Sequence, residues 1–167
     1  MEFERAKNRF IQTWGSLGSS WGINKTMAQI HALLMVSDDS LSMEDIMEEL
    51  HISRGNASMN LRGLIDWGIA YKEYKPGERR EYYTSEKNIN ELARKIAKER
   101  SKREIKPAVA VLQEVSQIDD MGRKDAQVFK EKTAELYEFV SKADSMLERI
   151  TDQKENWVTK TLIKLIT

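Results

Sequence analysis

Residues 41–84 decide the fold: LSMEDIMEELHISRGNASMNLRGLIDWGIAYKEYKPGERREYYT. Apolar residues recur at helical spacing in two short segments, which are separated by the connection His51–Ile52. Gly68 follows the second segment, where the end of a helix commonly needs a left-handed residue. Two β-prone runs then flank Pro76 and Gly77, which is typical of a β-hairpin. This order predicts a winged helix-turn-helix.

Local signals indicate where the two helices begin and end. We expect the first helix to be opened by Ser42, with Asp45 three positions later in an approximation to the capping box. The second helix is expected to be capped by Ser53 and to run to about Trp67. Ala57 is small, which lets the two helices approach closely where they cross.

The outward face of the second helix and the tip of the hairpin carry residue types that suit DNA. Arginine can bond to guanine and asparagine to adenine with two hydrogen bonds each, and a helix N-terminus favours phosphate. Cations at a hairpin tip can enter a minor groove or lie along phosphates. The candidate DNA-binding residues are Ser53, Arg54, Gly55, Asn56, Ser58, Met59, Asn60 and Arg62 on the helix, and Lys75, Arg79 and Arg80 on the hairpin. The alternative interpretation is a solvated helix face and a charged turn that keeps a hairpin edge soluble.

Three segments resemble the GbsR branch of the MarR-type regulators: Leu41–Ile46, Ser53–Gly68 and Pro76–Tyr83. The resemblance extends from about Phe10 through the Lys106–Pro107 region. It implies a winged-helix fold, a homodimer built from N- and C-terminal helices, and control of transcription, commonly repression. Some members of the branch respond to choline-like ligands, so the resemblance also suggests a small-molecule effector.

The rest of the chain reads as helix, so the predicted fold class is mainly α with a small β-hairpin. Helices are expected over about 2–13, 25–36, 88–106, 107–118 and 124–150, with a short amphipathic piece over 157–166. Small residues over 15–22 predict an interruption of the first helix, in which the segment around Gly18 is a hinge or a close helix contact, or else a linker. The predicted organisation is an N-terminal dimerisation helix (1–23), a DNA-binding domain (24–87) and a C-terminal dimerisation region (88–167).

Apolar residues near the C-terminus need burial, and a partner chain is the economical way to supply it. A homodimer is therefore expected, with an internal helical bundle as the alternative.

Composition excludes several classes of protein and site. The 167 residues include no cysteine, which excludes disulfides and thiolate metal sites and is compatible with a cytoplasmic location. We find no secretory signal and no apolar run of membrane-spanning length, so no membrane association is expected. The 27 basic and 27 acidic side chains balance. Phosphate contact needs only a local basic surface, but this balance also fits a winged helix that docks proteins without specific DNA binding.

Five aromatic residues could line a cage for a quaternary ammonium ion through cation–π contacts. They are Trp14, Trp21, Trp67, Tyr71 and Tyr74. The favoured alternative is that these rings fill the junction between the DNA-binding and dimerisation regions. A ligand-binding enzyme in this region is a further alternative, although no acid/base pair accompanies the rings.

The two histidines do not indicate a metal site. His31 is expected to be a partly buried helix residue, and His51 to have a capping or surface role in the turn. Neither has other ligands at metal-binding spacing, and no nucleophile motif or phosphate-binding glycine loop is present. We therefore expect neither a cofactor nor catalysis.

Overall fold

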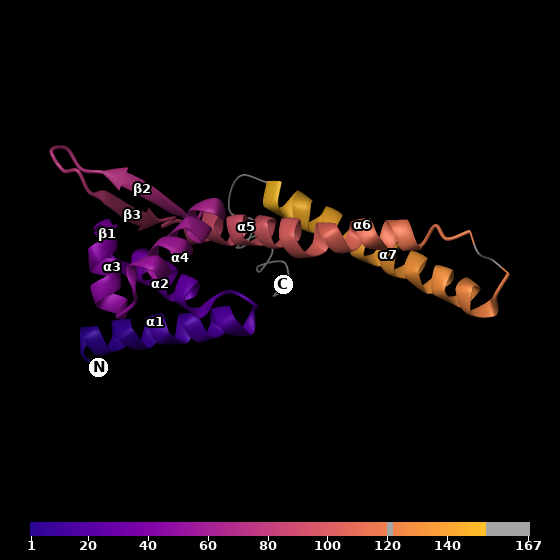
Figure 1. Ribbon diagram of the computed structural model, residues 1–167, viewed down its shortest axis with the longest axis horizontal. Helices are drawn as coiled ribbons and strands as arrows, with labels where there is room; N and C mark the ends of the chain where they lie inside the picture. The colour runs from indigo at the N-terminus through magenta and orange to yellow at the C-terminus, as the bar shows by residue number, and fades with distance from the viewer. Residues whose placement is uncertain (120–121, 153–167) are drawn as a thin grey trace, which may run out of the picture. The chain divides into compact units, whose positions relative to one another are not determined.

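The computed structural model describes residues 1–119 and 122–152, so the expected piece over 157–166 lies outside the described residues. The chain forms two compact units, Met1–Leu92 (unit 1) and Ala93–Thr167 (unit 2) (Figure 1). Among the described residues, no helix is long and apolar enough to cross a membrane.

Unit 1 confirms the predicted order of helix, turn, helix and hairpin, and adds one strand. Its elements are α1 (Phe3–Ser20), α2 (Lys25–Val36), β1 (Leu41–Ser42), α3 (Met43–Leu50), α4 (Arg54–Asp66), β2 (Ala70–Tyr74), β3 (Glu81–Ser85) and the start of α5 (Ile89–Arg100). Helices α3 and α4 form the helix-turn-helix, and the hairpin of residues 70–85 is the wing. The predicted mainly α fold with a small hairpin is therefore confirmed.

Polar caps fix the start of both helices of the helix-turn-helix. The backbone N–H of Asp45 donates to Ser42 Oγ at 3.2 Å, while Asp45 Oδ2 accepts from the backbone N–H of Ser42 at 2.8 Å. This reciprocal pair confirms the predicted capping box, with aspartate in the place of the usual glutamate. The Ser53 hydroxyl accepts from the backbone N–H of Asn56 at 3.3 Å, as predicted.

Left-handed residues terminate the same two helices. His51 follows α3 with φ 52°, and Gly68 follows the last residues of α4 with φ 69°. Gly68 therefore has the predicted conformation, which glycine adopts without steric cost. His51 has the predicted capping position at the end of α3.

The sheet has the strand order β1–β3–β2 and is antiparallel throughout. Between β2 and β3, the N–H of Glu78 donates to the carbonyl of Lys75 at 3.1 Å, and Gly77 has φ 82°. This is the Pro-Gly turn that the sequence predicts. Strand β1 was not predicted, since two residues are too few to show alternation. Its pairing of Leu41 with Tyr83 joins the start of α3 to the wing.

The core of unit 1 lies among its four helices. The largest fully buried apolar side chains are Ile11, Ile30, Leu33, Leu34, Ile46, Leu61 and Leu64. They come from α1, α2, α3 and α4 in turn, so burial of apolar surface holds the helix-turn-helix against the two preceding helices. The N-terminal helix, expected as a separate segment over 1–23, packs on α2 inside this unit.

The predicted interruption of the first helix is wrong. Helix α1 continues through Gly15 and Gly18 to Ser20, and both glycines are buried. A Cβ atom at Gly18 would lie 2.5 Å from Cβ of Ala28 in α2, so glycine permits a close approach of the two helices. Of the alternatives that the sequence left open, a hinge, a linker or a close helix contact, the structure shows the helix contact.

Gly18→Ala should destabilise the protein by about 1–3 kcal/mol, because the methyl of Ala28 is fixed to the backbone and α1 must move away from α2. Gly15→Ala is the matched control, since its nearest neighbour is the flexible side chain of Gln29. Both changes bring the same gain in helix propensity, of about 1 kcal/mol. Urea unfolding of the two variants checks the contrast. Equal stabilisation of both would contradict the close contact.

Unit 2 begins within α5 and continues through a π-helical segment, η1 (Ser101–Ile105), into α6 (Lys106–Val115). The predicted boundary between one helix ending near Lys106 and the next beginning near Pro107 is confirmed, since Pro107 lies in the first turn of α6. The first of these helices does not stay α-helical up to that boundary. Instead the backbone N–H of Lys106 donates to the carbonyl of Ser101, five residues earlier. Pro107 has no N–H to donate, and a π-turn before it is one of the recognised ways to accommodate such a gap.

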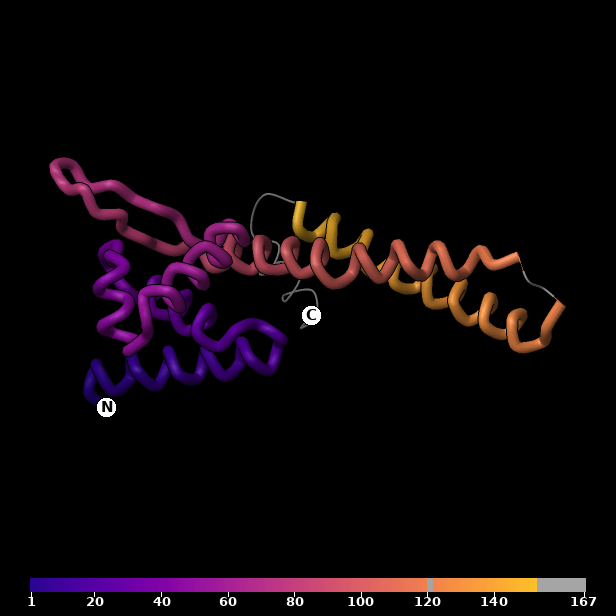
Figure 2. The backbone as a smooth tube through the Cα atoms, in the orientation of Figure 1, coloured from indigo at the N-terminus to yellow at the C-terminus, as the bar shows by residue number. Residues whose placement is uncertain are grey.

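The described part of unit 2 also contains α7 (Lys124–Asp152), which runs antiparallel beside α6 (Figure 2). Ser101 Oγ donates to Asp144 Oδ1 at 2.6 Å, and Lys106 pairs with Glu148 at 2.5 Å. No residue of α6 is buried. Apolar side chains exposed on the two helices are Val111, Val128, Phe129, Leu136, Phe139 and Met146. The hairpin of α6 and α7 therefore leaves a large share of its apolar surface uncovered.

Candidate nucleic-acid interface

The outward face of α4 presents most of the predicted helix residues. Ser53, Arg54, Gly55, Met59 and Arg62 are exposed, and Asn56 and Ser58 are half-buried. Gly55, Met59 and Arg62 follow one another at spacings of four and three residues, so they form a stripe along one side of the helix. Met59 is 62% exposed in the middle of that stripe. The stripe is therefore an exposed surface of unit 1.

Asn60 does not belong to this face. It is 4% exposed, and its side-chain amide donates to the Asn56 carbonyl at 2.8 Å and to Asn56 Oδ1 at 2.6 Å. Helical periodicity explains the difference, because Asn60 shares the buried side of α4 with Ala57, Leu61 and Leu64. The expectation that Asn60 reaches a phosphate is therefore wrong for this arrangement.

The three predicted cations of the wing lie at its tip. Arg79 and Arg80 are exposed, and within the described residues neither has an ion pair within 4 Å. Lys75 is half-buried, with Nζ 4.1 Å from the centre of the Tyr82 ring. The cation–π contact orients Lys75, whereas the two arginines keep their hydrogen-bond donors for another molecule.

A groove of about 440 Å³ separates α4 from the wing. Its lining residues are Met43, Ser58, Leu61, Arg62, Ile65, Lys72, Glu81 and Tyr83. Lys72 pairs with Glu81 at 2.8 Å, and this hydrogen bond raises the pKa of Lys72. Arg62 lies close enough to oppose that rise by charge repulsion. Sequence reasoning missed Lys72, although strand alternation places it on the same face of β2 as Ala70, which packs into the core.

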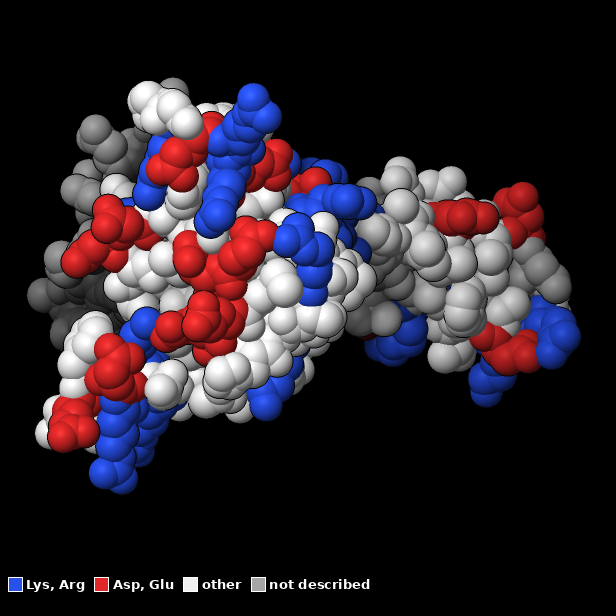
Figure 3. Space-filling view, turned by 60° about the vertical axis from the view of Figure 1, so that its left-hand side comes forward, with Lys and Arg blue, Asp and Glu red and all other residues white. Residues whose placement is uncertain are grey.

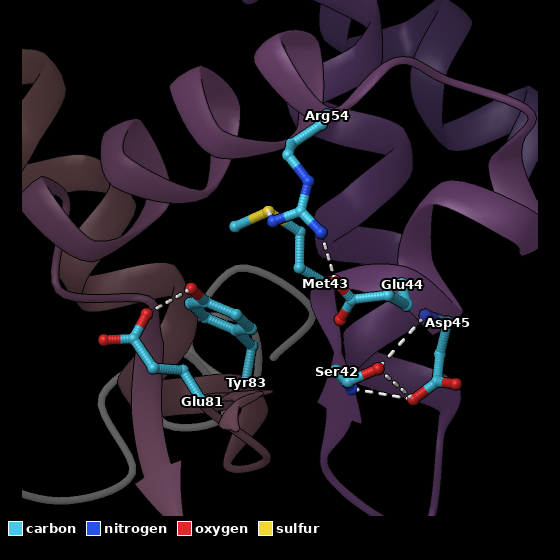
Figure 4. Close-up of polar contacts among 7 residues, drawn as sticks. All are labelled: Ser42, Met43, Glu44, Asp45, Arg54, Glu81 and Tyr83. Atoms are coloured by element: carbon cyan, nitrogen blue, oxygen red, sulfur yellow. Dashed lines mark hydrogen bonds and ion pairs between the residues drawn. The ribbon is translucent and has the colours of Figure 1, made fainter. Parts of the chain in front are cut away.

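Tyr83 anchors the wing beside this groove (Figure 4). Its side chain is buried, and its hydroxyl donates to Glu81 Oε2 at 2.9 Å. Burial, together with this hydrogen bond, raises the pKa of Tyr83 to about 12. Tyr83 therefore remains a neutral donor at physiological pH, and its hydroxyl holds the Glu81 carboxylate beside the groove.

Acidic side chains lie among these cations. Glu44 pairs with Arg54, and its own backbone hydrogen bond and the Arg54 side chain hold the pKa of Glu44 below its ordinary value (Figure 4). The charge of Arg80 acts in the same direction on both Glu44 and Asp45. On the face drawn in Figure 3, blue and red side chains are interspersed. The interface is thus a mixed surface with local cations rather than a uniformly basic one.

The five predicted cage residues do not form a single cage. Tyr71 and Tyr74 are three positions apart on β2, so they lie on opposite faces of the wing. Their hydroxyls donate to different carboxylates, those of Glu86 and Glu81. Trp14 instead contacts the rings of Phe10 and His31 inside unit 1, while Trp21 is 53% exposed and Trp67 half-buried.

His31 is a neutral core residue. It is 3% exposed, and Trp14 Nε1 donates to its Nδ1 at 3.3 Å, so the ring proton resides on Nε2. No partner of Nε2 is found within the described part of the chain. Burial lowers the pKa of His31 to about 4. Over residues 1–119 and 122–152, no group of three His, Cys, Asp or Glu residues is placed to hold a metal ion.

Comparison with known proteins adds two kinds of finding. Residues 21–81 match the model of the MarR family. This match spans α2, the helix-turn-helix and most of the wing. A search of curated proteins finds no match.

Two solved structures resemble the chain. A protein described as a transcriptional regulator is 20% identical over 86% of this chain and 99% of its own, with a TM-score of 0.58. A mutant of S. aureus MepR bound to an oligodeoxyribonucleotide is 17% identical over 84% of this chain and 94% of its own, with a TM-score of 0.42. At these identities the first likeness supports the fold alone.

Proposed function

We propose that the protein is a transcription regulator that binds double-stranded DNA in a sequence-specific manner. It acts as a homodimer and as a repressor. One observation carries the proposal: the exposed stripe of α4 lies beside a wing whose tip holds Arg79 and Arg80 without intramolecular ion pairs among the described residues. The MarR-family match over residues 21–81 supports the same function. On its helix and wing sequence, we place the chain in the GbsR branch of that family.

The proposed mode of binding puts α4 in the major groove. Arg62 then meets a guanine edge, Met59 a thymine methyl group, and the N-terminus of α4 a phosphate. Arg79 and Arg80 contact phosphates or enter the adjacent minor groove. Two copies of α4 would lie about 34 Å apart to reach successive major grooves.

The exposed apolar surface supports the homodimer. Phe139 is 73% exposed on α7 and Val111 is 58% exposed on α6, and further apolar side chains of α7 are also exposed. A second copy that covers these side chains would remove them from water. A ligand that shifts the paired helices would change the spacing of the two α4 helices and release the DNA.

A binding selection tests the function. The purified protein is mixed with genomic fragments at two salt concentrations, and bound fragments are sequenced. We expect enrichment of a palindromic site and weaker binding at the higher salt concentration. Binding without enrichment would refute sequence specificity.

Arg62→Ala should weaken binding to the enriched duplex by roughly 1–3 kcal/mol and relax the preference at one base pair of each half-site. Titration of duplexes that vary at each position measures both effects. A uniform loss across all sequences would assign Arg62 to a phosphate instead. Unchanged affinity would remove Arg62 from the interface.

A protein-docking winged helix is the second candidate. The equal numbers of acidic and basic side chains and the Arg54–Glu44 pair favour it. It predicts no DNA binding above the level of a neutral control protein in the same selection.

A further inference from the structure

We propose that Glu44 is a specificity-determining residue, which positions Arg54 for a base contact and repels phosphates when Arg54 meets no matching base. The inference rests on the proposed DNA-binding function. Glu44 lies on α3, the helix that precedes α4. Its carboxylate is repelled by phosphate, so it does not itself bind the DNA backbone.

The fold places the backbone of Glu44 near the start of α4. Glu44 is the second residue of α3, whose start is held by the capping box of Ser42 and Asp45. Strand β1 pairs Ser42 with Tyr82 of the wing. The backbone that carries Glu44 is therefore tied both to its own helix and to β3.

Two contacts hold the Arg54 guanidinium against this backbone (Figure 4). Nη2 donates to Glu44 Oε1, and Nη1 lies 3.9 Å from the sulfur of Met43. A guanidinium has five N–H donors in a fixed plane, so these contacts orient Arg54 while leaving donors for a base edge. The side chain of Arg54 remains 65% exposed, which leaves that edge accessible.

The Glu44 carboxylate also weakens contacts to DNA phosphates, which do not depend on the base sequence. Its charge acts on Arg80 of the wing as well as on Arg54. A phosphate that approaches either cation therefore also approaches a negative charge. A guanine edge is neutral and escapes most of that repulsion, so Glu44 disfavours random DNA more than the matching site.

The test compares wild type, Glu44→Gln and Glu44→Asp on two probes: a duplex enriched by the wild-type protein and a random-sequence duplex of equal length. Removing two carboxylates per dimer should strengthen binding to the random duplex about fivefold. The ratio of the affinity for the enriched duplex to the affinity for the random duplex should fall about tenfold, because an amide oxygen holds the Arg54 guanidinium more weakly than a carboxylate does. Glu44→Asp keeps the charge but is too short to hold Arg54, so it should lower the ratio without strengthening the random complex.

Glu48→Gln removes an equal charge from an exposed position on the same helix and should leave the ratio within about twofold of wild type. Equal discrimination by wild type and Glu44→Gln would overturn the inference while leaving the function intact. A similar fall in the Glu48→Gln variant would also overturn it. A wild type that binds both probes equally would instead refute the proposed function, and the inference with it. Because the Arg54–Glu44 pair is exposed, all variants should unfold at nearly the wild-type urea concentration.

Discussion

Replacing both Arg79 and Arg80 with alanine should weaken DNA binding on the order of 10²-fold at 200 mM salt. In a dimer the double variant removes four exposed cations, and each phosphate contact contributes about 0.9 to the slope of log affinity against log salt. The slope should therefore become shallower by about 3.6. The deficit should grow as the salt concentration falls. Fluorescence anisotropy with the enriched duplex at five salt concentrations measures both quantities.

The matched control is Arg5→Ala with Arg9→Ala, which removes the same number of exposed arginines from α1 of the same unit. It should leave the slope close to the wild-type value. If the two double variants had the same slope of log affinity against log salt concentration, the arginines of the wing would act only through the net charge of the protein. The proposed wing contact would then be refuted.

The protein should lose about 3 kcal/mol of unfolding free energy between pH 6.5 and pH 4 through His31 alone. Burial lowers the pKa of His31 from 6.5 to about 4, so the unfolded chain takes up a proton in this range and the folded protein does not. The stabilisation is complete above pH 6.5, declines as the pH falls, and is lost below about pH 4.

His31→Asn provides the comparison, since asparagine offers an acceptor to the indole of Trp14 but does not titrate. Carboxylates with lowered pKa values, such as Glu44 and Asp45, also destabilise the protein on acidification, but they do so equally in both proteins. Urea unfolding at pH 7 and pH 4 should show a smaller loss for the variant. Parallel losses would contradict the neutral, buried state of His31.

Features with local signals could be predicted from the sequence. The caps at Ser42 and Ser53 depend on residues three positions away, and the bends at Gly68 and Gly77 depend on one residue each. These signals, combined with helical spacing, were sufficient to predict the helix-turn-helix and the wing.

Features that depend on distant residues could not be predicted in this way. In the sequence alone, Gly18 is typical of a helix break. Its role in the contact with Ala28 of the next helix is apparent only in the structure. The burial of Asn60, in contrast, could have been predicted, because Asn60 lies at helical spacing from Ala57 and Leu64.

Some residues of the candidate interface could likewise be predicted from the sequence, and one contact could not. The outward positions of Arg54, Met59 and Arg62 follow from helical periodicity, and the arginines of the wing follow from the turn. The carboxylate of Glu44 reaches Arg54 across ten residues, through the fold of α3 onto α4. A single sequence carries no signal for that contact.

A photo-crosslink at Met59 shows whether the exposed stripe of α4 touches DNA. A benzophenone amino acid at this position, 62% exposed, should crosslink to the enriched duplex, and excess unlabelled duplex should suppress the product. The same group at exposed Ser16 of α1 should give no product. A complex that forms with normal affinity, yet crosslinks at Ser16 and not at Met59, would contradict the account.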